Sequence, residues 1–191
     1  MVSLIKLASF FLAATGWTMT GVGSAFAQGV ERREAHAHVH GAADMSFVID
    51  RDRLLVELAA PMGDMVGFES APKNAADRMK IDQATRLLND AARVVAPGTA
   101  AGCRVTETSV RMPFGGAARS ADHHDHDPKG SHVDVEASYV FACRSIGALD
   151  RVEVTVFRTF PELETIEAVF LGPRTQVARK LKSSSPVFRL K

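Results

Sequence analysis

The chain has 191 residues, of which 46% are hydrophobic and 24% are charged. These values are typical of one globular domain and exclude a disordered or fibrous chain. The formal net charge is only +1, so the sequence lacks the basic excess of a nucleic-acid-binding protein, and we expect no nucleic-acid partner.

Residues 1–27 predict a signal peptide. Lys6 is the only charged residue among them, an apolar run follows it, and residues 25–27 (Ala-Phe-Ala) have the small-x-small pattern of a signal-peptidase site. We expect cleavage after residue 27, no stable membrane insertion afterwards, and a single domain over residues 28–191. The alternative is an uncleaved membrane anchor, which the glycines within the apolar stretch disfavour.

Residues 43–60 predict a β-hairpin. Hydrophobic and polar side chains alternate along residues 43–50, which is the pattern of a half-buried strand. The polar residues 51–53 predict the turn, and a second strand follows until Pro61 ends it. Residues 61–72 then predict a loop with apolar content.

Residues 74–95 predict one amphipathic helix of about 20 residues. Asn74 suits the N-cap position, with Asp77 three residues later. Apolar residues recur after it at helical spacing, namely Ile81, Ala84, Leu88, Ala91 and Val95. Pro97 and Gly98 end the run.

The C-terminal part of the chain predicts mainly strands. They lie at residues 103–112, 133–144, 151–160 and 163–171, with a short edge strand at 187–190. We expect the first two to pair with each other, and the next two to form a hairpin around Pro161 and Glu162. This order of elements predicts an α+β domain, an antiparallel sheet of about six strands with one main helix on a face.

The two cysteines, Cys103 and Cys143, predict a disulfide between two of these strands. If the strands pair antiparallel with the cysteines opposite each other, Met112 lies opposite Asp134 and both strands are used over their full lengths. Opposed residues can bring their Cβ atoms to disulfide distance, and an oxidising compartment permits the bond. Two buried free thiols are the alternative.

Three histidines, His36, His38 and His40, alternate just before the first strand. On an extended backbone they point to the same side, and neutral imidazole binds Zn²⁺ and other divalent transition metals. The outer pair of a straight strand lies about 13 Å apart, so we expect two of the three to share one ion. Glu57, Glu69 or a residue from a second cluster would complete the site. The alternative is three incidental surface histidines.

That second cluster lies in residues 115–132, which predict a loop rich in histidine and aspartate. Its histidines are His123, His124, His126 and His132. Such tracts bind divalent metals loosely and raise their local concentration. We therefore predict a metal-collecting loop whose base is held by the disulfide. His132, beside the returning strand, is also a candidate for the first site, and a solvated polar loop is the alternative.

No enzyme motif accompanies these clusters. The sequence lacks the His-Glu-x-x-His helix of zincins and the Gly-x-Ser-x-Gly turn of hydrolases. We therefore expect no enzyme, and a small metal-dependent hydrolase is the least favoured function because no general base is positioned. Met62 and Met65 raise copper(I) as an alternative metal, although methionines in an apolar loop are more often packing residues.

Several segments together resemble one family. They are His38-Val-His-Gly-Ala-Ala-Asp-Met45, Leu54-Leu-Val-Glu-Leu58, Val66-Gly-Phe-Glu-Ser-Ala-Pro72 and Phe160-Pro-Glu-Leu-Glu-Thr-Ile166. Their order, with the His/Asp tract, resembles the ZrgA-like periplasmic zinc-binding proteins of Gram-negative bacteria.

The resemblance implies a periplasmic protein that sequesters zinc and passes it to a zinc ABC transporter or its solute-binding protein. The chain departs from the family's pattern at Ser70, where a histidine is frequent, and in its shorter His/Asp tract, so the number of zinc sites is left open. The alternative function is a non-enzymatic periplasmic interaction domain with incidental surface histidines.

Overall fold

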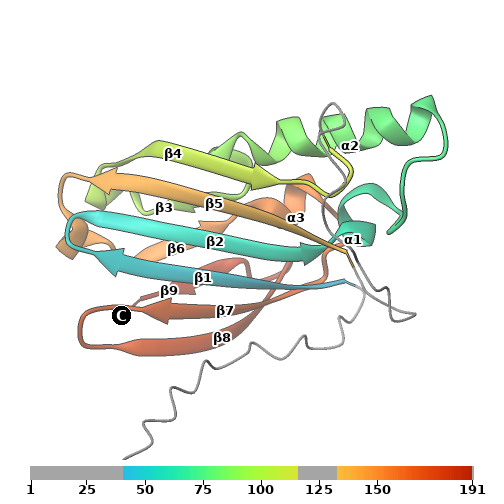
Figure 1. The fold of residues 1–191 in the computed structure, drawn as a ribbon. Coiled ribbons are helices and arrows are strands. Elements are labelled where there is room, and N and C mark those ends of the chain that lie inside the picture. The colour runs from blue at the N-terminus through green and yellow to red at the C-terminus, as the bar shows by residue number, and fades with distance from the viewer. Residues whose placement is uncertain (1–40, 116–132, 191) are drawn as a thin grey trace, which may run out of the picture. The chain divides into compact units, whose positions relative to one another are not determined.

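The computed structural model describes residues 41–115 and 133–190. The predicted signal peptide and all seven histidines lie outside these ranges. The described elements are mostly strands, arranged in a six-stranded and a three-stranded sheet (Figure 1).

Figure 1 shows the strands of the larger sheet side by side. In the order in which they pair, they are β4 (Cys103–Arg111), β5 (Asp134–Cys143), β2 (Arg53–Pro61), β1 (Ala42–Asp50), β7 (Thr165–Leu171) and β8 (Gln176–Lys182). The smaller sheet has the order β3 (Val95–Pro97), β6 (Arg151–Val154) and β9 (Val187–Arg189). The α-helices are α1 (Met62–Val66), α2 (Ala75–Leu88) and α3 (Val156–Thr159).

The predicted α+β class is correct in outline, but the purely antiparallel sheet is wrong. β1 and β7 pair parallel, with Ala42 opposite Thr165, whereas the other pairs of the large sheet are antiparallel. The parallel pair arises because the chain leaves β5, forms β6 in the second sheet and α3, and only then returns beside β1. A parallel pair requires a crossover of this kind.

The first predicted hairpin is confirmed, and the last one is wrong. β1 and β2 pair antiparallel, with Asp50 opposite Arg53 across the turn. Of the segments 151–160 and 163–171, the first supplies β6 and α3, and the second contributes β7 to the other sheet. β7 instead pairs with β8, a strand that the hydrophobic pattern does not predict.

The core lies on one face of the large sheet, and the second sheet packs there. On β1, Met45 and Phe47 are buried, whereas Ser46 between them faces the other side. The rings of Phe47 and Phe188 on β9 are 5.2 Å apart, and neither residue is exposed. The hydrophobic residues of the alternating pattern therefore lie on the buried face of the sheet, and the polar residues between them lie on the open face.

The predicted helix is confirmed, but it is shorter than expected. Asn74 is its N-cap, and its side-chain oxygen accepts a hydrogen bond from the Asp77 N–H at 2.9 Å. α2 ends at Leu88, and the apolar positions further along, Ala91 and Val95, lie in a 3₁₀ turn and in β3. Their spacing continues a helical pattern because they face the same core.

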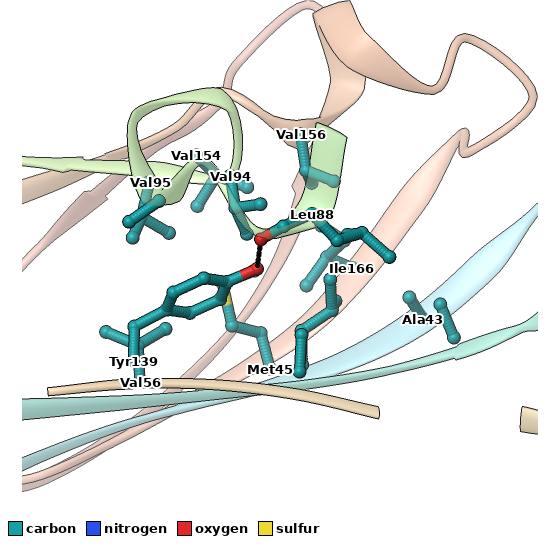
Figure 2. Close-up of a cluster of buried hydrophobic side chains, with 14 of the residues drawn as sticks. Ala43, Met45, Val56, Leu88, Val94, Val95, Tyr139, Val154, Val156 and Ile166 are labelled. Carbon is teal, nitrogen blue, oxygen red and sulfur yellow. Dashed lines mark hydrogen bonds between the residues drawn. The ribbon is translucent and has the colours of Figure 1, made fainter. Parts of the chain in front are cut away.

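Tyr139 joins α2 to the large sheet. Its ring extends from β5 into the core, and its hydroxyl donates to the Leu88 carbonyl at 2.6 Å (Figure 2). Only 1% of the residue is exposed. The bond satisfies a carbonyl at the C-terminal end of α2, which has no partner within the helix.

The ionisation of Tyr139 should be shifted to high pH in the folded protein. Burial of the phenol, with a smaller contribution from Asp90, raises its pKa. A phenol whose pKa is higher in the folded than in the unfolded chain stabilises the fold. This contribution to the free energy of unfolding is complete below the unfolded-state pKa of about 10, and it is lost as the pH rises through the folded-state pKa. Because the chain has one tyrosine, the tyrosinate absorbance reports Tyr139 alone. It should appear at higher pH in native than in urea-unfolded protein.

Tyr139→Phe is the matched variant for this measurement. It should lower the free energy of unfolding at neutral pH by about 1 kcal/mol, the usual net value of one hydrogen bond. It should also remove the part of the alkaline stability loss that Tyr139 causes. A native protein that forms tyrosinate at the same pH as the unfolded chain would contradict the prediction.

Candidate metal centre

One end of the six-stranded sheet gathers the beginnings of β1, β5 and β7 and the ends of β2, β4 and β8. The registers show this, because Ala42 lies opposite Thr165 and Pro61 lies opposite Asp134. We call it the Gly41 end, after the residue that precedes β1, and define it by these four residues together with Gly41.

Both predicted histidine clusters are joined to the Gly41 end by the chain itself. His40 is bonded to Gly41, and His132 is bonded to Val133, which precedes β5. Only β2 separates β1 from β5, so two strand spacings, about 9–10 Å, lie between the two strands. The two clusters therefore leave the sheet from neighbouring points, although their histidines lie outside the described residues.

Gly41 is held by both of its backbone polar atoms. Its N–H donates to Oδ2 of Asp64 at 2.9 Å, and its carbonyl accepts from the N–H groups of Glu164 and Thr165 at 2.8 and 2.9 Å. Its φ is +79°, and a Cβ there would lie 3.2 Å from Cγ of Glu164. Glycine suits this position because it adopts a positive φ without strain and leaves room for the close approach.

The short helix α1 connects the two points of attachment. Its Asp64 accepts the hydrogen bond from Gly41, while the N–H of its first residue, Met62, donates to the Val133 carbonyl at 2.9 Å. Asp64 is only 6% exposed, and a buried carboxylate requires hydrogen-bond partners to offset its desolvation. α1 therefore sets the positions of Gly41 and Val133 relative to each other.

Carboxylates are frequent around the Gly41 end. They belong to Asp64, Glu69, Asp134, Glu162 and Glu164. Carboxylates that are grouped in this way give a negative potential that attracts cations. Within residues 41–115 and 133–190, however, no three His, Cys, Asp or Glu side chains are close enough to hold a metal ion. The described carboxylates alone do not form a metal site.

The structure separates the two glutamates considered as additional ligands. Glu57 lies on the open face of β2, where it accepts a hydrogen bond from Ser46 at 3.3 Å. It is four residues from Pro61, about 13 Å along the strand, so it lies away from the Gly41 end. Glu69 packs on α1, with Oε1 3.1 Å from the position of a Cβ on Gly63. Of the two, Glu69 is the one that lies beside α1.

Met62 and Met65 are packing residues in this structure. They are 0% and 8% exposed and belong to the hydrophobic core. A thioether that is buried among apolar side chains contributes to packing. This burial argues against copper(I) binding through them.

The predicted disulfide is confirmed, since Cys103 and Cys143 are bonded and lie opposite each other in the β4–β5 register. The predicted register is wrong further along, because a β-bulge lies between Val105 and Glu107. The extra residue shifts the pairing by one position and places Arg111 opposite Glu136, with which it forms a salt bridge.

The disulfide lies at the other end of the sheet from Gly41. Cys143 lies nine positions after Asp134 on β5, about 30 Å at the usual rise of a strand. The bond therefore closes the base of the β4–β5 pair, and the segment with His123, His124 and His126 joins the two strands at the Gly41 end.

Sequence reasoning does not identify Asp64. Its partner Gly41 is 23 positions away, and nothing in residues 61–72 points to that contact. The one local signal is Gly41 itself, because a glycine directly before a strand suggests a special backbone conformation.

A comparison with protein families matches residues 37–190 to the family described as ZrgA family zinc uptake protein. The matched range contains every predicted histidine ligand except His36. No curated protein matches the chain. Among the helices of the described residues, none is long and apolar enough to cross a membrane.

Proposed function

The chain belongs to the ZrgA family of zinc uptake proteins, and we propose that it is a periplasmic protein that binds Zn²⁺ at the Gly41 end and passes it to a zinc ABC uptake system. The observation that supports this proposal is the attachment of both histidine clusters at one end of the sheet, to β1 and β5, which only β2 separates. The disulfide supports export, because such bonds persist in oxidising compartments.

The coordination chemistry of zinc favours a site that draws on both clusters. Zinc in proteins is usually tetrahedral, with imidazole nitrogens about 2.0–2.1 Å away. Three histidines of one straight strand do not all reach one ion, so His36, His38 and His40 supply two ligands. His132 is bonded to Val133, which precedes β5, and is our candidate for a third ligand. Glu69 is the candidate among the described carboxylates for completing the set.

The remaining histidines have a different role in this proposal. His123, His124 and His126 alternate with aspartates in a tract that gathers zinc by local concentration. Since the tract joins β4 to β5 near the Gly41 end, zinc held there is delivered close to the tighter site. The protein acts by binding and transfer, and we assign it no catalytic step.

Calorimetric titration of the mature protein with zinc tests the proposal. We expect one tight site and additional weak binding. His36/His38/His40→Ala should remove the tight site and keep the weak binding. The matched variant His123/His124/His126→Ala should keep the tight site and lose most of the weak binding. A wild-type protein that shows no tight site, or triple variants with the same heats as wild type, would refute the assignment.

The alternative, an interaction domain with incidental histidines, predicts a different effect of zinc on stability. A ligand that binds only the folded state must stabilise it, by about 2.7 kcal/mol at a hundredfold excess over its dissociation constant. The proposed function therefore predicts a rise in the melting temperature with added zinc, and the alternative predicts none.

Transfer of zinc has its own test. Zinc-loaded protein is mixed with the zinc-free solute-binding protein of a zinc ABC system, and the appearance of the loaded acceptor is followed in time. Direct transfer predicts a rate that rises with acceptor concentration beyond the rate of zinc release into a chelator. A rate equal to spontaneous release would restrict the role to buffering.

A further inference from the structure

We propose that the outer edge of β8 docks an extended, acidic segment of a partner protein, which pairs with β8 as an additional strand. β8 is the last strand of the six-stranded sheet, and within the described residues no further strand lies on its outer side (Figure 1). The inference goes beyond the proposed function, because it depends neither on the histidine clusters nor on the Gly41 end.

The backbone of β8 is open along this edge. At the turn before it, the N–H of Gly172 donates to the Thr175 carbonyl at 2.8 Å. Hydrogen-bonded positions alternate along an antiparallel pair, and the β7–β8 register has no shift, so every second residue from Thr175 onwards bonds to β7. The residues between them, Gln176, Ala178 and Lys180, direct their N–H and C=O groups outward. A regular strand with such free groups can pair with another chain.

The chain around this edge carries a basic excess. After Glu167 the sequence has six Lys and Arg residues and no Asp or Glu, although the net charge of the whole chain is only +1. Arg179 and Lys182 are exposed on β8 and form no salt bridge within residues 41–115 and 133–190. Their positive potential therefore acts on whatever approaches the edge, and it attracts carboxylates.

The contact of Lys180 with Glu167 shows which neighbour this strand accepts. The two residues lie opposite each other in the β7–β8 register, with Nζ 2.9 Å from Oε1. Opposite charges that face each other across strands stabilise the pairing, and like charges weaken it. Arg179 and Lys182 lie on opposite faces of the sheet, because side chains alternate along a strand. An added strand reaches both of them, whereas a flat anionic membrane would meet only one face.

The same charges disfavour a second copy of β8 as the occupant. Pairing of two β8 edges would place Lys and Arg opposite Lys and Arg, and lysines on edge strands commonly prevent such self-association. The other edge strand, β4, is interrupted by its β-bulge and mixes Arg104 and Arg111 with Glu107. Of the two edges of the large sheet, only β8 therefore combines a regular backbone with charges of one sign.

Three capped peptides, each as long as the seven residues of β8, test the proposal on the full mature chain. The first repeats valine and two glutamates, so that carboxylates lie on both faces of an added strand. The second has lysines in place of the glutamates. The third keeps the glutamates but has proline in place of valine, which removes N–H groups needed for pairing. Fluorescence anisotropy of labelled peptides should show that the first binds about tenfold or more tightly than the other two.

Two changes in β8 separate strand pairing from charge. Ala178→Pro removes an outward N–H, keeps the charge and leaves the hydrogen bonds to β7, since edge strands tolerate proline at such positions. It should lower the affinity for the valine–glutamate peptide about tenfold. Arg179→Glu/Lys182→Glu should remove this binding and allow the lysine peptide to bind. The matched control, Arg78→Glu/Arg86→Glu, changes the net charge equally at exposed positions of α2 and should bind the valine–glutamate peptide as wild type does.

Contrary results would overturn the proposal in distinct ways. Equal binding of the valine and proline forms of the glutamate peptide, or wild-type affinity in Ala178→Pro, would reject strand addition. Equal losses in the β8 and α2 charge variants would reject this edge as the site. Binding to phosphatidylglycerol vesicles without binding to the valine–glutamate peptide would replace the acidic protein segment by a lipid surface. Association of the wild-type chain with itself through β8, detected as a dimer that Ala178→Pro abolishes, would replace it by a second copy.

Discussion

Replacement of both Cys103 and Cys143 by alanine should lower the free energy of unfolding by about 4 kcal/mol. The bond joins residues with a sequence separation of 40, and closing a loop of this size restricts the unfolded chain by about that amount in the chain-entropy description. The double variant avoids the free thiol that a single substitution would leave. Urea unfolding of the variant and of the oxidised wild type measures the difference.

The effect should be concentrated on β4. None of its nine residues is buried, so it is held mainly by its hydrogen bonds to β5 and by the disulfide. Its amides should lose protection from hydrogen exchange before those of β1 and β2 do. Reduction of the wild-type protein is the matched control and should reproduce both changes. An unchanged unfolding midpoint in the variant and after reduction would contradict the prediction.

Zinc affinity provides a second control for the disulfide variant. The cysteines lie about 30 Å along β5 from the Gly41 end. The folded variant should therefore bind zinc as tightly as the wild type at neutral pH. A change in stability without a change in affinity separates the structural role of the disulfide from the binding role of the opposite end.

Local patterns predict the parts of the fold that have one buried and one open face. β1 and β2 alternate clearly because each carries core residues such as Phe47 and Val56 on one side only. The start of α2 is predictable because its N-cap is a local interaction between Asn74 and Asp77. The disulfide is predictable because two strands and two cysteines permit few arrangements.

Pairing between distant segments is not visible in such patterns. β8 is an edge strand in which Leu181 alone is buried, so it has no alternation to detect. β6 does alternate, but its pattern does not reveal whether β7 or β3 is its partner. The parallel contact of β1 with β7 joins residues more than a hundred positions apart, such as Ala42 and Thr165. These features depend on tertiary packing rather than on local sequence.

The same distinction applies to the candidate metal centre. Histidine spacing identifies the residues with the right chemistry, because His36, His38 and His40 stand out in any reading of the sequence. It does not reveal that both clusters join the sheet at one end, which depends on the register of β1, β2 and β5. Nor does it reveal Asp64, whose contact with Gly41 exists only after α1 has packed.

Zinc affinity at the tight site should fall about 100-fold between roughly pH 7.5 and pH 5.5. Imidazole must be neutral to bind zinc, and the unperturbed histidine pKa is about 6.5. The zinc affinity therefore has its full value above this pKa and decreases below it. Between pH 7.5 and pH 5.5 the decrease is about tenfold for each histidine ligand. Two ligands from His36, His38 and His40 give the predicted 100-fold, and ligation by His132 as a third would increase the fall to about 1000-fold.

The size of this pH effect distinguishes histidine ligands from carboxylate ligands at the Gly41 end. A free carboxylic acid has a reference pKa of about 4, so the zinc affinity of a site made of carboxylates alone would change little over the same interval. Competition with a chelator whose own pH dependence is known measures the affinity at both pH values. A change of less than about tenfold would mean fewer than one histidine ligand and would move the site to the carboxylates around α1.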